Sequence, residues 1–201
     1  MKKIISMLLT LCLMVSVTAA FAEGDETSMI GNTEESAATT LVVYFSATGN
    51  TKPLAEYAAS YLSADLYDIV PAEPYTDADL NYNNNSSRST IEMGDNAARP
   101  AIDGLIESIE QYDTIFIGYP IWWGEAPRII NTFLESFDLS GKTIVPFCTS
   151  ASSGLGSSAR MLQAKYGETS TWLDGKRFSI GTDENTIIEW IDGLELFTEA
   201  E

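Results

Sequence analysis

The sequence predicts an α/β domain with a doubly wound, five-stranded parallel sheet and helices on both of its faces. Three observations predict this fold: continuous apolar runs rich in β-branched and aromatic residues, segments with helical spacing of apolar residues, and alternation of the two along the chain. Strands buried on both faces need such runs, and parallel neighbours need helical crossovers. A chain of 201 residues is also long enough to form a packed core without disulfides.

Strands and helices alternate in a regular order. The apolar runs place the strands at residues 41–45, 66–70, 114–118, 142–147 and 177–180. Apolar residues three and four positions apart place the helices at residues 53–62, 101–112, 127–137, 157–166 and 184–197. Pro53 is compatible with the first of these helices because it falls in the first turn.

Residues 71–100 are predicted to form a long polar insertion after the second strand. The segment has two prolines near its start and is rich in asparagine at positions 81–85. Insertions of this length are usually functional or disordered. The insertion carries an unusual mixture of aromatic, polar and charged residues, namely Tyr75, Tyr82, Asn83, Arg88, Glu92 and Arg99. Two interpretations stay open: Arg88 and Glu92 pair at helical spacing and only hold the segment together, or the segment forms a lid over a binding site.

The first 22 residues have the three parts of a secretory signal peptide. Two lysines precede an uncharged apolar run, and an Ala-Phe-Ala sequence places cleavage after Ala22. The alternative is an N-terminal membrane anchor. Residues 23–40 are small and polar and are predicted to be a flexible leader, so that the folded domain is 41–201. We therefore expect an exported protein with no stable membrane insertion after cleavage.

Composition excludes several kinds of function. The 11 basic and 29 acidic residues give a net charge of −18, which argues against binding nucleic acid. The chain has no histidine, so Ser-His-Asp triads, Cys-His pairs and His-ligated metals are excluded. We expect no catalytic side chain and no metal. The acidic surplus either keeps the protein soluble or steers a basic partner.

The two cysteines lie in different contexts. Cys12 falls in the predicted signal peptide, so Cys148 would stand alone in the mature protein. Cys148 follows a buried strand and has no Lys or Arg beside it in sequence to lower its pKa. A structural role as a small apolar residue is therefore favoured over a nucleophile.

The loop after the first strand has the composition of a phosphate site. It leads directly into a helix and reads Ser46-Ala47-Thr48-Gly49-Asn50-Thr51. Hydroxyls, an amide and exposed N–H groups at a helix N-terminus attract a phosphate. The lysine of a P-loop is missing, and so is the G-x-G-x-x-G pattern, which favours one phosphate monoester over a triphosphate with magnesium. The alternative is a Ser/Thr-rich helix cap without a ligand.

Two further loops are expected at the same edge of the sheet, because ligands of doubly wound folds bind at the carboxyl ends of the strands. The loop after the third strand contains Pro120-Ile121-Trp122-Trp123-Gly124. One indole could stack on a flat ring while the other packs beneath the loop. The loop after the fourth strand is Thr149-Ser150-Ala151-Ser152-Ser153-Gly154. Its small residues would let the backbone approach the polar edge of a ligand, or form a flexible surface loop.

Residues 43–51 resemble the FMN phosphate-binding signature of flavodoxins, whose centre is T/S-x-T-G-N-T. The order of strands and helices over residues 41–198 is also similar to the flavodoxin-like fold. This resemblance implies the sheet order 2-1-3-4-5, with FMN at the switch between the first and third strands. Similarity to flavodoxin-like loops of the form Y-P-x-W-W/Y-G implies that Trp123 faces the ring. The matching fourth loop of flavodoxins usually carries a second aromatic residue, and residues 149–154 have none.

The resemblance implies an electron-transfer protein that shuttles electrons through a non-covalently bound FMN. Residues 46–51 would hold the phosphate, residues 120–124 one face of the ring, and residues 149–154 its pyrimidine side. The implied partner is a basic redox protein or a small electron acceptor. Two alternatives remain open: an FMN-dependent NAD(P)H or quinone reductase on the same fold, and a non-redox protein that binds another phosphorylated ligand.

Overall fold

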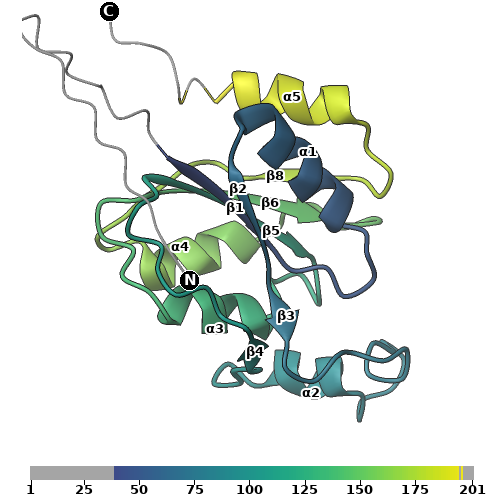
Figure 1. Ribbon diagram of the computed structural model, residues 1–201. Helices are drawn as coiled ribbons and strands as arrows, with labels where there is room; N and C mark the ends of the chain where they lie inside the picture. Colours follow the sequence, from purple (N-terminus) through teal and green to yellow (C-terminus); the bar gives the residue numbers. More distant parts are fainter. Residues whose placement is uncertain (1–38, 195, 197–201) are drawn as a thin grey trace, which may run out of the picture. The chain divides into compact units, whose positions relative to one another are not determined.

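The buried apolar segments form a parallel sheet in the computed structural model, which describes residues 39–194 and 196 (Figure 1). Its strands are β1 (Thr40–Tyr44), β2 (Asp65–Asp68), β5 (Thr114–Pro120), β6 (Thr143–Thr149), β7 (Thr171–Trp172) and β8 (Lys176–Phe178). The order across the sheet is β2-β1-β5-β6-β7, and β8 also pairs with β6. The expected order 2-1-3-4-5 is confirmed. The predicted signal peptide and residues 23–38 of the predicted leader lie outside the described residues.

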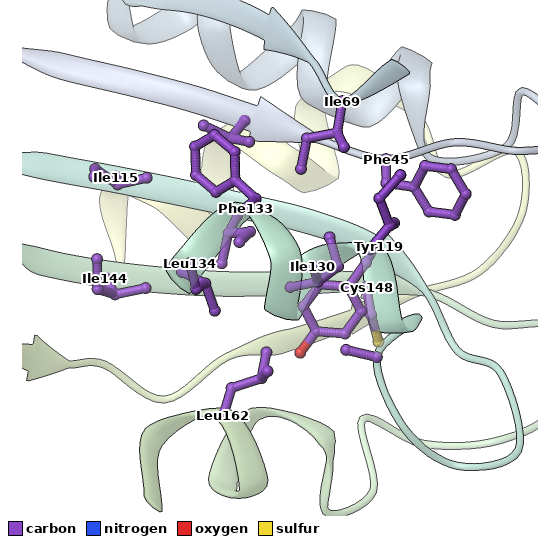
Figure 2. Packing of buried hydrophobic residues seen from close by; sticks show 14 of the residues in the cluster. Phe45, Ile69, Ile115, Tyr119, Ile130, Phe133, Leu134, Ile144, Cys148 and Leu162 are labelled. Carbon is purple, nitrogen blue, oxygen red and sulfur yellow. The ribbon is translucent and has the colours of Figure 1, made fainter. Parts of the chain in front are cut away.

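Helices cover both faces of the sheet, as predicted (Figure 1). Helices α1 (Lys52–Leu62) and α5 (Glu184–Asp192) lie on one face, and α3 (Arg128–Glu135) and α4 (Ser158–Tyr166) on the other. Successive strand side chains alternate between two cores. One core contains Val42, Tyr44, Phe116, Val145 and Phe147. Figure 2 shows the other, where Phe133, Leu134 and Leu162 pack against the strands.

The fifth strand position is divided into two short strands because of a proline in β6. Leu173 donates its N–H to the Ile144 carbonyl at 3.0 Å, so the backbone hydrogen-bonding groups of Ile144 point toward that edge of the sheet. The backbone of Pro146, two residues further on, points toward the same edge and has no N–H to donate. The ladder resumes only where Phe147 pairs with Lys176. The predicted strand 177–180 is therefore β7 and β8, starting earlier and interrupted once.

The predicted helix at residues 101–112 is wrong. Ile102 and Asp103 form β4, which pairs antiparallel with β3 (Val70–Pro71), and Gly104 then adopts a φ of 61° that ends any regular run. Ile109 and Tyr112 are still buried, but they lie at the two ends of a turn and not in a helix. The described residues instead include a helix inside the insertion, α2 (Arg88–Gly94). The predicted helix 184–197 is α5, which ends at Asp192, and residues 195 and 197 lie outside the described part of the chain.

Candidate functional site

A cavity of about 460 Å³ lies where the loops after β1, β5 and β6 meet. These loops follow the carboxyl ends of parallel strands, and the volume is typical of small-molecule sites. Among the residues that the structure describes, no charged side chain lines the cavity. Its lining comprises Thr48, Asn50, Leu80, Tyr82, Pro120, Ile121, Trp122, Trp123, Gly124, Thr149, Ser150, Ala151, Ser152, Ser153 and Ile180.

Five of the predicted site residues do not line this cavity: Ser46, Ala47, Gly49, Thr51 and Gly154. The hydroxyl of Ser46 accepts the N–H groups of Thr51 and Lys52, at 3.0 and 3.2 Å, and so satisfies donors of the first turn of α1. Ala47 faces a smaller neighbouring cavity with Tyr75. Ser46 therefore shapes the loop through the lone pairs of its oxygen, and its O–H group can still donate a hydrogen bond.

Unpaired backbone donors remain on the β1 loop. Within the described residues, the N–H groups of Ala47, Thr48 and Asn50 donate to no protein acceptor. The side chain of Asn50 donates to the Thr48 hydroxyl at 2.8 Å. Gly49 has a φ of 80°, a conformation that strains any other residue, and a Cβ there would meet nothing within 4 Å. The loop is thus held in an open shape with its amides available to an anion.

The loop after β5 is a tight two-residue turn with a tryptophan in an unusual place. Trp122 and Glu125 exchange both backbone hydrogen bonds at 3.0 Å, and the two central residues, Trp123 and Gly124, have φ values of 48° and 81°. Positive φ at both central positions defines a type I′ turn, which favours Asn-Gly. A bulky side chain in the left-handed region costs about 1–2 kcal/mol. Such strain is concentrated at functional sites.

The two tryptophans of this turn have opposite environments. Trp122 is 4% exposed and packs edge-on against Phe45 and Tyr75, with ring centroids 5.6 and 5.2 Å away. Trp123 is 43% exposed at the cavity. One indole therefore belongs to the core beneath the loop, as expected, and the other is available to a flat ligand.

The loop after β6 is fixed to both of its neighbours. The Thr149 hydroxyl lies 2.8 Å from the hydroxyl of buried Thr51, which joins this loop to the β1 loop. On the other side, Arg177 of β8 donates to the carbonyls of Ser150 and Ala151 at 2.6 and 3.2 Å. Thr51 and Arg177 therefore hold the β6 loop in place through these contacts, although neither residue lines the cavity itself.

A family model described as flavodoxin matches residues 39–194. The chain belongs to the flavodoxin family. Candidate flavoproteins from Bacteroides eggerthii and Bacteroides uniformis are similar in structure, with TM-scores of 0.74 for both and 50% and 45% sequence identity. The matches cover 79% and 78% of this chain and 99% of each of those chains.

A flavoprotein in complex with FMN from Lactobacillus acidophilus is 24% identical, with a TM-score of 0.59. That match covers 77% of this chain and 99% of the other, and a likeness at this identity shows a shared fold. No protein of curated function matches the sequence.

In this flavodoxin-family protein the insertion forms part of the site. Leu80 and Tyr82 line the cavity, and the Tyr82 ring lies 4.5 Å from the Trp123 ring between centroids, inclined at 37°. Arg88 and Glu92 form the predicted pair at 2.7 Å, and the Arg88 guanidinium lies 4.1 Å from the Tyr75 ring centroid. The structural and lid interpretations are therefore compatible, since the pair anchors the segment that carries Tyr82.

Cys148 is unsuited to nucleophilic chemistry. It is fully buried on β6 (Figure 2), and burial raises the pKa of its thiol to about 12, opposed by the charge of Arg177. Very little thiolate therefore exists near neutral pH.

Between residues 39 and 194, no group of three or more His, Cys, Asp or Glu side chains could hold a metal ion. Across the same residues no helix combines the length and apolar character needed to span a bilayer.

Sequence reasoning missed two cavity residues and left a third unassigned. Ile180 lies just after β8, where ligands of doubly wound folds bind, but the predicted strand 177–180 placed it inside the strand. Leu80 lies in the insertion and carries no local signal. Tyr82 belongs to the unusual mixture of residues in the insertion, and nothing in the sequence shows that it lies beside Trp123.

Proposed function

We propose that the protein is an electron-transfer flavoprotein that binds one FMN non-covalently in the cavity above. The observation that carries the proposal is Trp123, a half-exposed indole held at a positive φ beside a phosphate-type loop with free amides. A family relative with FMN and the same fold supports the choice of flavin. When bound, FMN supplies the redox chemistry, exchanging electrons singly or in pairs.

The residues present fit this cofactor. The N–H groups of Ala47, Thr48 and Asn50 suit one phosphate without a lysine or magnesium. Trp123 offers an apolar face for the ring system. The small residues 149–153 offer hydroxyl and backbone groups to its polar edge. These residues bind and orient the cofactor and shield it from water.

An electron carrier is favoured over an NAD(P)H reductase by the charges around the cavity. A nicotinamide dinucleotide brings phosphates, which need cations or a second anion site. In the described part of the chain no Lys or Arg lines the cavity, and Arg177 donates to loop carbonyls. A quinone reductase is less strongly disfavoured by this argument, since quinones carry no phosphate.

Titration of the purified protein with FMN tests the proposal. We expect one-to-one quenching of flavin fluorescence with a dissociation constant in the micromolar range or below. Riboflavin, which lacks the phosphate, should bind much more weakly, because it makes no contact with the β1 loop. Equal binding of the two would contradict the phosphate assignment. Steady oxidation of NAD(P)H by the FMN-loaded protein, above the rate with free FMN, would favour the reductase instead.

The acidic composition favours a basic redox partner, and the N-terminal sequence favours export. With a net charge of −18, encounter with a cationic protein should be fast and should slow as salt is raised. A salt-independent electron-transfer rate would argue for a small acceptor.

Export predicts a mature N-terminus at Glu23, which mass spectrometry of the protein purified from its source cells would reveal.

A further inference from the structure

Tyr82 and Trp123 form an aromatic pair on the surface of the molecule. Their ring centroids are 4.5 Å apart and the planes are inclined by 37°. Tyr82 is 55% exposed and Trp123 is 43% exposed, and both line the cavity assigned to FMN. The pair therefore covers one side of the candidate site without belonging to either core.

The segment that carries Tyr82 has a fixed base. Tyr75 packs against Phe45 and donates its hydroxyl to Glu92 at 2.5 Å. Further along, Leu80 packs on the core, and the side chain of Asn81 accepts the N–H of Asn83 at 3.0 Å, which makes a local turn around Tyr82. Tyr82 is thus placed by ordered residues on both sides.

The spacing of the pair leaves no room for a third ring. A flat ring between two aromatic side chains needs two stacking contacts, so the outer rings must lie about 7 Å apart. The measured centroid distance is 4.5 Å. In the described part of the chain, Tyr82 is also the one aromatic ring that contacts Trp123, and the β6 loop offers only Thr, Ser and Ala to the cavity.

We propose that Tyr82 is the second ring-binding residue of the site: it covers the flavin face opposite Trp123, and in the FMN-free protein it stacks directly on Trp123. The inference rests on the proposed FMN function and adds a residue and an order of events to it. FMN enters by parting the two rings, and Tyr82 then replaces its contact with Trp123 by a contact with the flavin. With both faces covered, electrons leave through the exposed edge, and a hydride donor finds no free face.

Three variants test this role: Tyr82→Ala, Tyr82→Phe and, as a control on the same insertion, Ile91→Ala. Ile91 is exposed on α2 and does not line the cavity. In FMN-free protein carrying Trp172→Phe, so that Trp123 is the main exposed indole, acrylamide quenching of tryptophan emission should rise for Tyr82→Ala. It should stay near the starting value for Tyr82→Phe and for Ile91→Ala, which keep the stack.

Stopped-flow mixing with FMN gives the second readout. Tyr82→Ala should bind FMN faster, because no pair has to open, and release it roughly 10-fold faster, because one stacking contact is lost. Tyr82→Phe should keep both rates. If the parent protein binds FMN and Tyr82→Ala binds and releases it at the wild-type rates, the role of Tyr82 is overturned while the proposed function stands. Failure of the parent protein to bind FMN would overturn the proposed function, and this inference with it.

Discussion

Replacing Trp123 by asparagine is expected to weaken FMN binding by roughly 10- to 100-fold, because stacking on an aromatic face contributes about 1–3 kcal/mol. The substitution keeps the backbone of the turn, since Asn-Gly is a favoured central pair of a type I′ turn. The loss should therefore come from the missing indole and not from a displaced loop. Fluorescence titration of the variant with FMN measures the effect.

The same substitution should change the free energy of unfolding by little. Trp123 loses its contact with Tyr82, which contributes about 0.5–1.5 kcal/mol. Asparagine, however, relieves most of the cost of a bulky residue at a φ of 48°, about 1–2 kcal/mol. The two effects oppose each other and are similar in size. A half-exposed tryptophan at an ordinary φ would have no such compensation.

Trp190→Phe is the matched control for loss of an indole away from the cavity. Trp190 packs in the other core, against Phe116 and Phe178, and does not line the cavity, so this change should lower the free energy of unfolding and leave FMN affinity nearly unchanged. The two variants thus separate binding from stability. Unaltered FMN affinity in the Trp123→Asn variant, measured beside this control, would place the ring elsewhere.

The central strands were predictable because burial on both faces leaves a local record in the sequence. β1, β5 and β6 are continuous apolar runs, and any register that exposed them would cost hydrophobic burial. Helix α3 was predictable for a related reason, since its apolar residues recur on the face that packs against the sheet. Local pattern and tertiary environment agree in these elements.

The segment after the insertion was not predictable in the same way. Ile102 and Ile109 have near-helical spacing, but Ile102 pairs with Pro71, which lies far away along the chain. Gly104 then takes a positive φ that no helix contains. The division of the fifth strand likewise depends on Pro146 in a neighbouring strand. In each case the deciding contact lies between residues that are distant in sequence.

The loops of the candidate site were predictable from the sequence, whereas the environments of its aromatic residues were not. Its three loops follow strand ends, so the fold rule brings them together once the strands are known. The exposure of Trp123 and the burial of Trp122 depend on the type I′ turn, which the composition Trp-Trp-Gly does not announce. Tyr82 reaches the cavity only through the folding of the insertion on Tyr75 and Leu80.

Replacing Arg128 by methionine is expected to lower the free energy of unfolding by about 3–5 kcal/mol, because it leaves buried partners unpaired. Arg128 begins α3 and is 6% exposed. Its guanidinium donates to the carbonyls of Met93 and Asp95, at 2.9 and 3.2 Å, and to the side chains of Asn96 and Glu125, at 2.8 and 2.7 Å. Urea unfolding of the FMN-free protein measures the loss.

FMN affinity should fall as well, although Arg128 does not line the cavity. Glu125 closes the turn that holds Trp123, and Met93, Asp95 and Asn96 lie at the end of the insertion that carries Tyr82. Arg128 therefore connects the supports of both aromatic residues. Its removal should let them move independently, and limited proteolysis should cut residues 76–87 faster in the variant than in the parent.

Lys52→Met provides the control for loss of a positive charge. Lys52 and Glu56 form an exposed pair at 3.8 Å, and such pairs contribute less than about 1 kcal/mol. The magnitude of the Arg128→Met effect should lie toward the lower end of its range, since Glu125 is partly exposed and water can solvate its carboxylate. A double-mutant cycle with Glu125→Gln separates the ion pair from the bonds to the insertion. If Arg128→Met costs no more than Lys52→Met, the guanidinium does not connect the two supports, and their coupling must come from the Tyr75–Trp122 contact instead.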